Sequence, residues 1–115
     1  MIKLIQMADL DGVDLVPQAI IRQPISFFAW KFHNFVEDHD DLGMYEGAAF
    51  KLDDDLCFAI KRYYGYPADT TTIYLPNDIR TVDEIAVALP RILKELEISQ
   101  AFFLLEWRRM DDPDL

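Results

Sequence analysis

Three short runs decide the fold: MYEGAAFKL at residues 44–52, LCFAIKRYY at 56–64 and TTTIYL at 70–75. Each run is rich in aromatic and β-branched residues, which favour strands. The gaps between them, residues 53–55 and 65–69, hold Asp, Gly and Pro, which favour turns. The sequence therefore predicts three consecutive antiparallel strands.

The second run also predicts which side chains face the core. Leu56, Phe58 and Ile60 occupy alternate positions, and Cys57 and Lys61 fall between and after them. Successive side chains of a strand point to opposite faces of the sheet. We therefore expect one fully apolar face that packs on a core and a second, more polar face.

A helix is predicted downstream of these strands. Thr81 and Glu84 have the spacing of a capping box, and apolar residues follow at helical intervals up to Leu96. Pro90 lies inside this pattern and predicts a kink or a break just before it. The apolar run 98–109 then predicts a buried strand that lies parallel to strand 70–75.

The pattern upstream is ambiguous. From Ile25 the apolar residues follow one helical face and Pro24 suits a first turn, which predicts a helix of about 14 residues. Alternate aromatic residues in the same stretch, such as Phe28 and Trp30, also fit a strand. Residues 2–8 predict a short strand, and the Asx-rich segment after it predicts a turn.

Together these elements predict a single α+β domain over residues 1–115, with a mixed, mostly antiparallel sheet and helices packed on one face. The length of 115 residues and an apolar content of 51% suffice for one core. The longest unbroken apolar stretch, 101–105, is far too short to span a bilayer. A lone cysteine, Cys57, excludes an internal disulfide, and no signal peptide is evident, so we expect a cytoplasmic protein.

Acidic residues outnumber basic ones and are concentrated in one region. The chain has 21 Asp plus Glu and 11 Lys plus Arg, a net charge of −10. Between residues 37 and 55, eight carboxylates accompany Lys51 alone, a local sum of 1 − 8 = −7. They are Glu37, Asp38, Asp40, Asp41, Glu46, Asp53, Asp54 and Asp55. The two clusters bracket an apolar segment, so one hairpin would bring them close together.

This charge predicts a partner of opposite sign. An acidic protein repels phosphate backbones and attracts basic surfaces, so we expect a basic protein and not nucleic acid. Tyr63, Tyr64 and Tyr66 lie in a short loop with two bases, and tyrosine is enriched at binding hot spots. These tyrosines and the eight carboxylates are the predicted partner-binding residues. An alternative is that the acidic turns serve only solubility.

Two groups of residues could carry catalysis. Asp9-Leu-Asp11 after an apolar run resembles the first motif of haloacid-dehalogenase-type phosphatases, which implies a nucleophilic Asp9 and an acid–base Asp11. The alternating strand–helix series of that family is missing, so a simple Asx turn is favoured. His33, Glu37 and His39 give one workable ligand pair on a helix, short of the three that a metal site needs. We predict neither a catalytic site, nor a metal, nor a cofactor.

The stretch from Tyr63 to Glu97, with DTTTIYLP at residues 69–76 and the helix after it, is similar to small acidic immunity proteins of bacterial toxin systems. The resemblance implies a protein that binds and neutralises a basic toxin, often a nuclease. Two other functions stay open. One is a small-molecule hydrolase or phosphatase, and the other is a subunit that self-associates, as a homodimer for example, through residues 27–35 or a free sheet edge.

Overall fold

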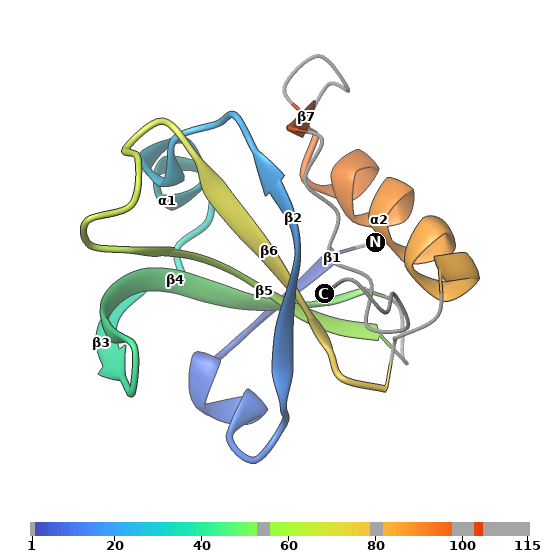
Figure 1. Cartoon of the computed structure of the whole chain (residues 1–115), viewed down its shortest axis with the longest axis horizontal. Helices are drawn as coiled ribbons and strands as arrows, with labels where there is room; N and C mark the ends of the chain where they lie inside the picture. The colour runs from blue at the N-terminus through green and yellow to red at the C-terminus, as the bar shows by residue number, and fades with distance from the viewer. Residues whose placement is uncertain (1, 53–55, 79–81, 98–102, 105–115) are drawn as a thin grey trace.

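A long hairpin forms the centre of the computed structural model, which describes residues 2–52, 56–78, 82–97 and 103–104 (Figure 1). Its strands are β4 (Gly43–Leu52) and β5 (Leu56–Tyr63). They pair antiparallel at eight consecutive positions, from Tyr45 opposite Tyr63 to Leu52 opposite Leu56. The two strands predicted at 44–52 and 56–64 are confirmed.

The sheet grows outward from this hairpin. On one side β6 (Thr71–Pro76) pairs with β5, β2 (Leu15–Ile21) pairs with β6, and β7 (Phe103–Leu104) pairs with β2. On the other side β4 has two partners: β3 (Val36–Asp40) along its first half and β1 (Ile2–Ile5) along its second. Every pairing in the described part of the sheet is antiparallel, and the order is β1-β4-β5-β6-β2-β7 with β3 beside β4.

The predicted α+β class with a mostly antiparallel sheet is confirmed. The strand predicted at 70–75 is confirmed as β6, and β1 occupies the first half of the segment 2–8. β6 and β7 run in the same direction, because each is antiparallel to β2, which lies between them. The sequence did not predict β2, because Pro17 and Gln18 interrupt its alternation. The structure accommodates them with a register shift between Pro17 and Ala19.

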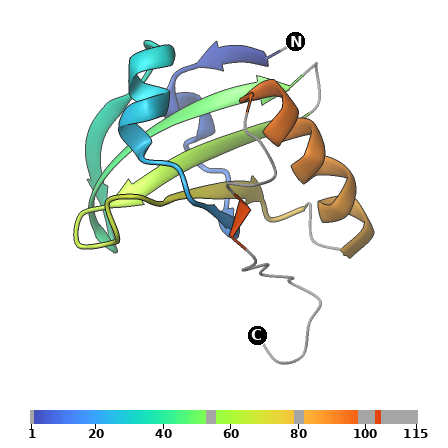
Figure 2. The ribbon, with the colours of Figure 1, turned by 90° about the horizontal axis from the view of Figure 1, so that it is seen from above.

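Two helices pack against one face of the sheet: α1 (Ile25–Lys31) and α2 (Val82–Glu95). Both contribute to the same buried cluster, where Phe28 of α1 and Leu89 of α2 meet side chains of the strands (Figure 2). Leu56, Phe58 and Ile60 of β5 belong to this cluster, as their alternation in the sequence predicted. The other strand residues of the cluster are Ala19, Ile21, Ala48, Phe50, Leu52, Ile73 and Leu75. No helix in the described ranges is long and apolar enough to cross a membrane.

The helix predicted from Ile25 is correct only for its first half. It ends at Lys31, and Phe32 is already extended, with φ −118° and ψ 137°. The side-chain amide of Asn34 donates hydrogen bonds to the carbonyls of Ile5 and Ala49, at 3.2 and 2.7 Å, which fixes the chain beside β4. Residues 36–40 then pair with β4, so tertiary pairing overrides the helical pattern.

The predicted helix downstream is confirmed as α2. It continues without a break through Pro90, whose side chain is exposed, so the predicted break does not occur. Buried side chains on both sides of the proline, Ile85, Leu89 and Ile92, hold the helix to the sheet. Thr81, the predicted cap, and all of the predicted strand 98–109 except residues 103–104 lie outside the described residues.

The opposite face of the sheet carries a smaller cluster that includes Ala59, Tyr63 and Tyr74. A short 3-10 helix, η1 (Met7–Leu10), covers part of it. Gly47 allows the close packing here, because a Cβ at this position would lie 2.7 Å from the Ile60 carbonyl oxygen. One face therefore holds the main core, and the other is only partly covered.

The packing of α2 is tested by a matched pair of substitutions. Leu89→Ala removes a side chain that is 0% exposed and should lower the free energy of unfolding by about 2–5 kcal/mol. Val87→Ala, on the exposed face of the same helix, should change it by less than about 0.5 kcal/mol. Urea unfolding followed by circular dichroism measures both. Equal losses would contradict the assignment of the buried face.

Candidate functional site

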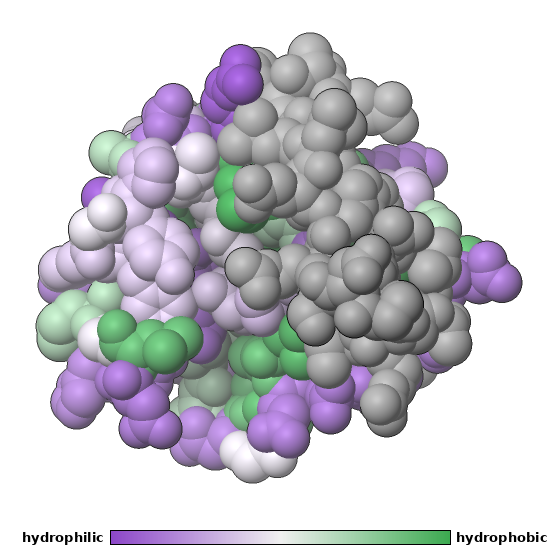
Figure 3. Space-filling view, viewed as in Figure 1, coloured by the Kyte–Doolittle hydropathy of each residue, from purple (hydrophilic) through white to green (hydrophobic). Residues whose placement is uncertain are grey.

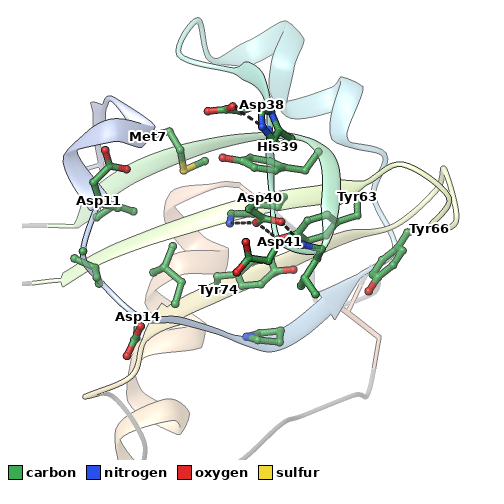
Figure 4. Close-up of a pocket in the computed structure, with 18 residues that line it drawn as sticks. Met7, Asp11, Asp14, Asp38, His39, Asp40, Asp41, Tyr63, Tyr66 and Tyr74 are labelled. Atoms are coloured by element: carbon green, nitrogen blue, oxygen red, sulfur yellow. Dashed lines mark hydrogen bonds and ion pairs between the residues drawn. The ribbon is translucent and has the colours of Figure 1, made fainter.

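The partly covered face of the sheet contains a pocket of about 750 Å³ (Figure 4). Its floor is formed by Tyr45 of β4, Lys61 and Tyr63 of β5, and Tyr74 of β6. The register explains why these side chains meet, since Tyr45 is opposite Tyr63 and both lie on the same face as Lys61. The segment from η1 to β2 forms one wall, and the hairpin between β3 and β4 forms the other.

The floor of the pocket encloses a lysine within tyrosine rings. Lys61 is 9% exposed, and its Nζ lies 4.5 Å from the ring centroid of Tyr45, 5.1 Å from that of Tyr74 and 5.9 Å from that of Tyr63. A cation over an aromatic face is stabilised by the negative charge of the ring face. Burial lowers the pKa of Lys61, and the ion pair with Asp40 only partly opposes this effect.

Asp40, at the end of β3, is the anion that faces this lysine. Its Oδ2 lies 3.7 Å from Lys61 Nζ and accepts a 2.6 Å hydrogen bond from the Tyr63 hydroxyl (Figure 4). Its Oδ1 accepts a 2.9 Å bond from the Leu42 N–H. Desolvation acts to raise the pKa of Asp40, but these hydrogen bonds, the Lys61 charge and the Gly43 N–H outweigh it and hold the pKa below its ordinary value.

Tyr45 and Tyr63 of the floor remain protonated because burial and nearby carboxylates raise their pKa values. Burial raises the pKa of Tyr45, and the negative charges of Asp38, Asp40 and Asp11 raise it further. Burial also raises the pKa of Tyr63, strengthened by its hydrogen bond to Asp40. Their hydroxyls can therefore donate hydrogen bonds across the whole physiological pH range.

The mouth of the pocket is acidic. Asp11 and Asp14 approach it from the connection between η1 and β2, and Asp38 and Asp41 from β3 and its turn (Figure 4). His39 lies beside Asp38, with 3.7 Å between Nδ1 and Oδ1. A cleft lined by charges of one sign concentrates the electric field at its opening. The mouth therefore attracts cations and repels anions.

Exposed apolar side chains lie around this acidic mouth and on the reverse face of the same end of the sheet. Nine large hydrophobic residues are exposed in the described part of the chain, and five of them lie around the pocket or at the same end of the sheet. They are Val13, Leu42, Met44, Tyr64 and Tyr66. Leu42, at the hairpin tip, is 77% exposed. Figure 3 shows hydrophobic atoms set among hydrophilic ones over the β3–β4 hairpin and the segment around η1.

Most of the predicted partner-binding residues come together at this end. Asp38, Asp40, Asp41, Tyr63 and Tyr66 line the pocket. Glu37, Glu46 and Tyr64 lie at the same end but on the other face of the sheet, where Glu37 is opposite Glu46 across β3 and β4. A hydrogen bond from the Tyr64 hydroxyl to Glu37 raises the pKa of this tyrosine.

The β4–β5 hairpin separates the residues that flank the second acidic cluster from the first acidic cluster. Asp53, Asp54 and Asp55 lie outside the described residues, but Leu52 and Leu56, which flank them in sequence, pair at the far end of β4 and β5. Seven residue steps separate Leu52 from Tyr45, a distance of about 23 Å along a strand. The residues that flank the second cluster therefore lie at the opposite end of β4 from the first cluster, and the proximity of the two clusters stays a prediction, because Asp53, Asp54 and Asp55 are not among the described residues.

The predicted catalytic groups are dispersed. Asp9 accepts a hydrogen bond from the Gln6 N–H at 3.0 Å and caps η1, while Asp11 lines the pocket. The helix expected to align His33 with Glu37 ends at Lys31, and Glu37 lies on β3. No three His, Cys, Asp or Glu side chains among the described residues are grouped to hold a metal ion.

Sequence reasoning missed the centre of the site. Lys61 was assigned to the face of β5 opposite the main core, yet its tyrosine surroundings depend on Tyr45 and Tyr74 from neighbouring strands. The approach of Asp11 and Asp14 depends on β2, which was not predicted. A single lysine within an apolar strand was the one signal available, since lysine is seldom buried unless paired.

Comparison with known protein families, with curated proteins and with solved structures finds no match to this chain.

The hydrogen bond between Tyr63 and Asp40 is tested by Tyr63→Phe. The substitution should raise the pKa of Asp40 and lower the free energy of unfolding by about 1 kcal/mol. Because the pKa of Asp40 is lowered in the folded protein, its ionised form stabilises the fold above its ordinary pKa, and this contribution disappears as pH falls through the lowered value. In the variant this contribution should be smaller, and its loss should be complete at a higher pH.

Carbon-detected NMR titration of the Asp40 carboxyl and urea unfolding from neutral to acidic pH measure the two effects. Tyr66→Phe is the matched control, because Tyr66 is 51% exposed and lines the same pocket. An unchanged Asp40 titration in Tyr63→Phe would contradict the assigned hydrogen bond.

Proposed function

We propose that this chain is a small acidic binding protein that docks the pocket end of its sheet onto a basic protein surface. The observation that supports this most is that exposed apolar side chains lie beside carboxylates at the pocket mouth. Val13, Leu42 and Tyr66 offer area to bury, and Asp38 and Asp41 at the same mouth offer charge. Protein interfaces combine apolar area with polar and charged groups.

Charge and burial would have different roles in this complex. The net charge of −10 would speed the encounter with a basic partner, and added salt would slow it. Residence time would depend on the apolar and aromatic side chains, because fully desolvated anchors dominate binding energy. Rim carboxylates such as Asp41 would then mainly affect the association rate.

The partner class that we propose is a basic toxin domain, such as a nuclease, which the chain would neutralise by covering its basic surface. The net charge of −10 and the acidic pocket mouth support this choice over a neutral or acidic partner. A surface that mimics the charge of phosphate would occupy the site that such a nuclease uses for its substrate. The proposal places the protein in the cytoplasm and requires neither catalysis nor a cofactor.

Two variants with the same change in charge test the location of this surface. Asp38→Asn/Asp41→Asn/Glu46→Gln neutralises three carboxylates at the pocket end, and Asp53→Asn/Asp54→Asn/Asp55→Asn neutralises three between Leu52 and Leu56. Each immobilised variant is exposed to a lysate of the source organism at low salt, and captured basic proteins are eluted by salt and measured by mass spectrometry. The first variant should capture about tenfold less basic protein than the wild type, a change of about 1.4 kcal/mol in binding free energy. The decrease in the second variant should be much smaller.

Equal losses in both variants would indicate attraction by net charge alone, and equal retention would exclude the pocket end as the binding surface. A stoichiometric basic protein released by salt would identify the target. The association rate of the purified pair, measured against ionic strength, then tests the proposed steering directly.

A second candidate function is self-association through α1. Trp30 on this helix is 85% exposed, and Phe27 is 39% exposed on the same short element. Large exposed aromatic side chains are typical of protein interfaces. Light scattering of the purified protein should show a dimer that Trp30→Ala converts to a monomer if this helix is the contact. A wild-type monomer at high concentration would exclude it.

A further inference from the structure

Lys61 differs from the other lysines of the chain in its surroundings. The five lysines are Lys3, Lys31, Lys51, Lys61 and Lys94, and Lys61 alone is buried. Its amine nevertheless lies against an open pocket of about 750 Å³, large enough for a small molecule to enter. A desolvated amine beside a cavity is the usual setting of a nucleophilic lysine.

Burial of the amine favours its uncharged form, whereas the ring faces and the Asp40 carboxylate favour the ammonium. Tyrosine rings from three strands replace most of its hydration, and burial lowers its pKa. A neutral amine has a free electron pair, whereas an ammonium has none. Asp40 Oδ2, at 3.7 Å, is the nearest carboxylate and is placed to receive the proton that the amine must lose.

We propose that Lys61 is the nucleophile of a carbonyl-binding site and forms an imine with a small neutral aldehyde or ketone. Asp40 first takes a proton from the ammonium. The nitrogen electron pair then forms a bond to the carbonyl carbon, and the carbonyl oxygen takes up a proton. The oxygen takes this first proton from the nitrogen and a second from protonated Asp40, and it leaves as water when the C–O bond breaks. The nitrogen electron pair forms the C=N bond, and the last N–H proton passes to the Asp40 carboxylate. Amine and carbonyl compound are thus converted to imine and water, with no oxidation or reduction.

The remaining contacts hold this arrangement in place. The Tyr63 hydroxyl donates to the same Oδ2 of Asp40, and the Leu42 N–H donates to Oδ1, so the carboxylate is fixed beside the amine. Gly47 leaves space for the lysine stem, because a Cβ there would lie 3.0 Å from Lys61 Cγ. Asp40 acts on protons directly, and Tyr63 and Gly47 position the reacting groups.

The lining of the pocket restricts the class of carbonyl compound. Tyr74, Leu10 and Leu15 provide an apolar wall that suits a hydrocarbon or aromatic group. Asp11, Asp14 and the other carboxylates at the mouth repel anions, so keto acids and phosphorylated aldehydes are disfavoured. The expected occupant is therefore neutral. This inference goes beyond the proposed function, and it holds whether or not the rim binds a protein.

Reductive trapping tests the proposal on the full chain. The wild-type protein is incubated with benzaldehyde and cyanoborohydride, which reduces an imine to a stable secondary amine. Peptide mass spectrometry over time then gives the labelling rate at each of the five lysines. Lys61 should be labelled first, ahead of the exposed Lys3 and Lys94. Glyoxylate, an anionic aldehyde, should label Lys61 more slowly than benzaldehyde relative to Lys94.

Two variants separate chemistry from access. Asp40→Asn, compared with wild type on the high-pH plateau of Lys61 labelling where the amine is neutral in both proteins, should slow labelling at Lys61 by about a hundredfold and leave Lys94 unchanged, because the proton acceptor is lost. Lys61→Arg keeps the cation over the tyrosine rings but has no reactive amine, so the fast phase of labelling should vanish. Labelling that follows exposure alone, with Lys3 and Lys94 first, would overturn the proposal in the wild-type protein, whether or not either variant folds. Faster labelling of Lys61 by glyoxylate would overturn the assigned substrate class.

Discussion

The antiparallel pairing of β4 with β5 is the constraint on which the rest of the structure depends. Eight consecutive pairs fix the register, and the register decides which side chains share a face. Phe50 and Phe58 thereby stack in the main core with ring centroids 5.3 Å apart, while Tyr45 and Tyr63 meet on the other face at 5.6 Å. A slip of one residue would exchange the two faces, exposing the phenylalanines and burying charged side chains. The register of β4 and β5 therefore determines both the core and the pocket.

The pocket exists because the two faces of the sheet are covered unequally. Both helices pack on the main core, where α1 and α2 bury apolar side chains against the strands. Among the described residues, the other face is covered by η1, the segment that follows it and the β3–β4 hairpin, which leave a cavity beside Lys61. Side chains with both an apolar body and a polar tip suit such a half-covered surface, and tyrosines accordingly form most of the pocket floor.

The sequence was sufficient for the elements whose local signals agree with their tertiary contacts. In β5 and α2, propensity and apolar periodicity point to the same structure, and both were predicted correctly. The segment after Lys31 carries helical spacing, but hydrogen bonds from Asn34 and pairing with β4 decide its structure, and no local pattern encodes those contacts. The acidic residues at 37–41 were identified correctly as a cluster. Their proximity to Asp11 depends on β2, whose Pro17 and Gln18 hide its alternation.

The charges of the site lie in two layers, an exposed one at the mouth and a buried one at the floor, and solvent affects the two differently. The carboxylates at the mouth are exposed, so each is well solvated and acts mainly at a distance, on the approach of a partner or ligand. The charges of the floor are desolvated, and there a single hydrogen bond or ion pair changes protonation. Asp40 belongs to both layers: it remains an anion through its hydrogen bonds, and it is the counter-ion of Lys61. A cation bound at the mouth would make the electrostatic potential at the floor less negative. The acidic rim and the buried amine therefore share one carboxylate, that of Asp40.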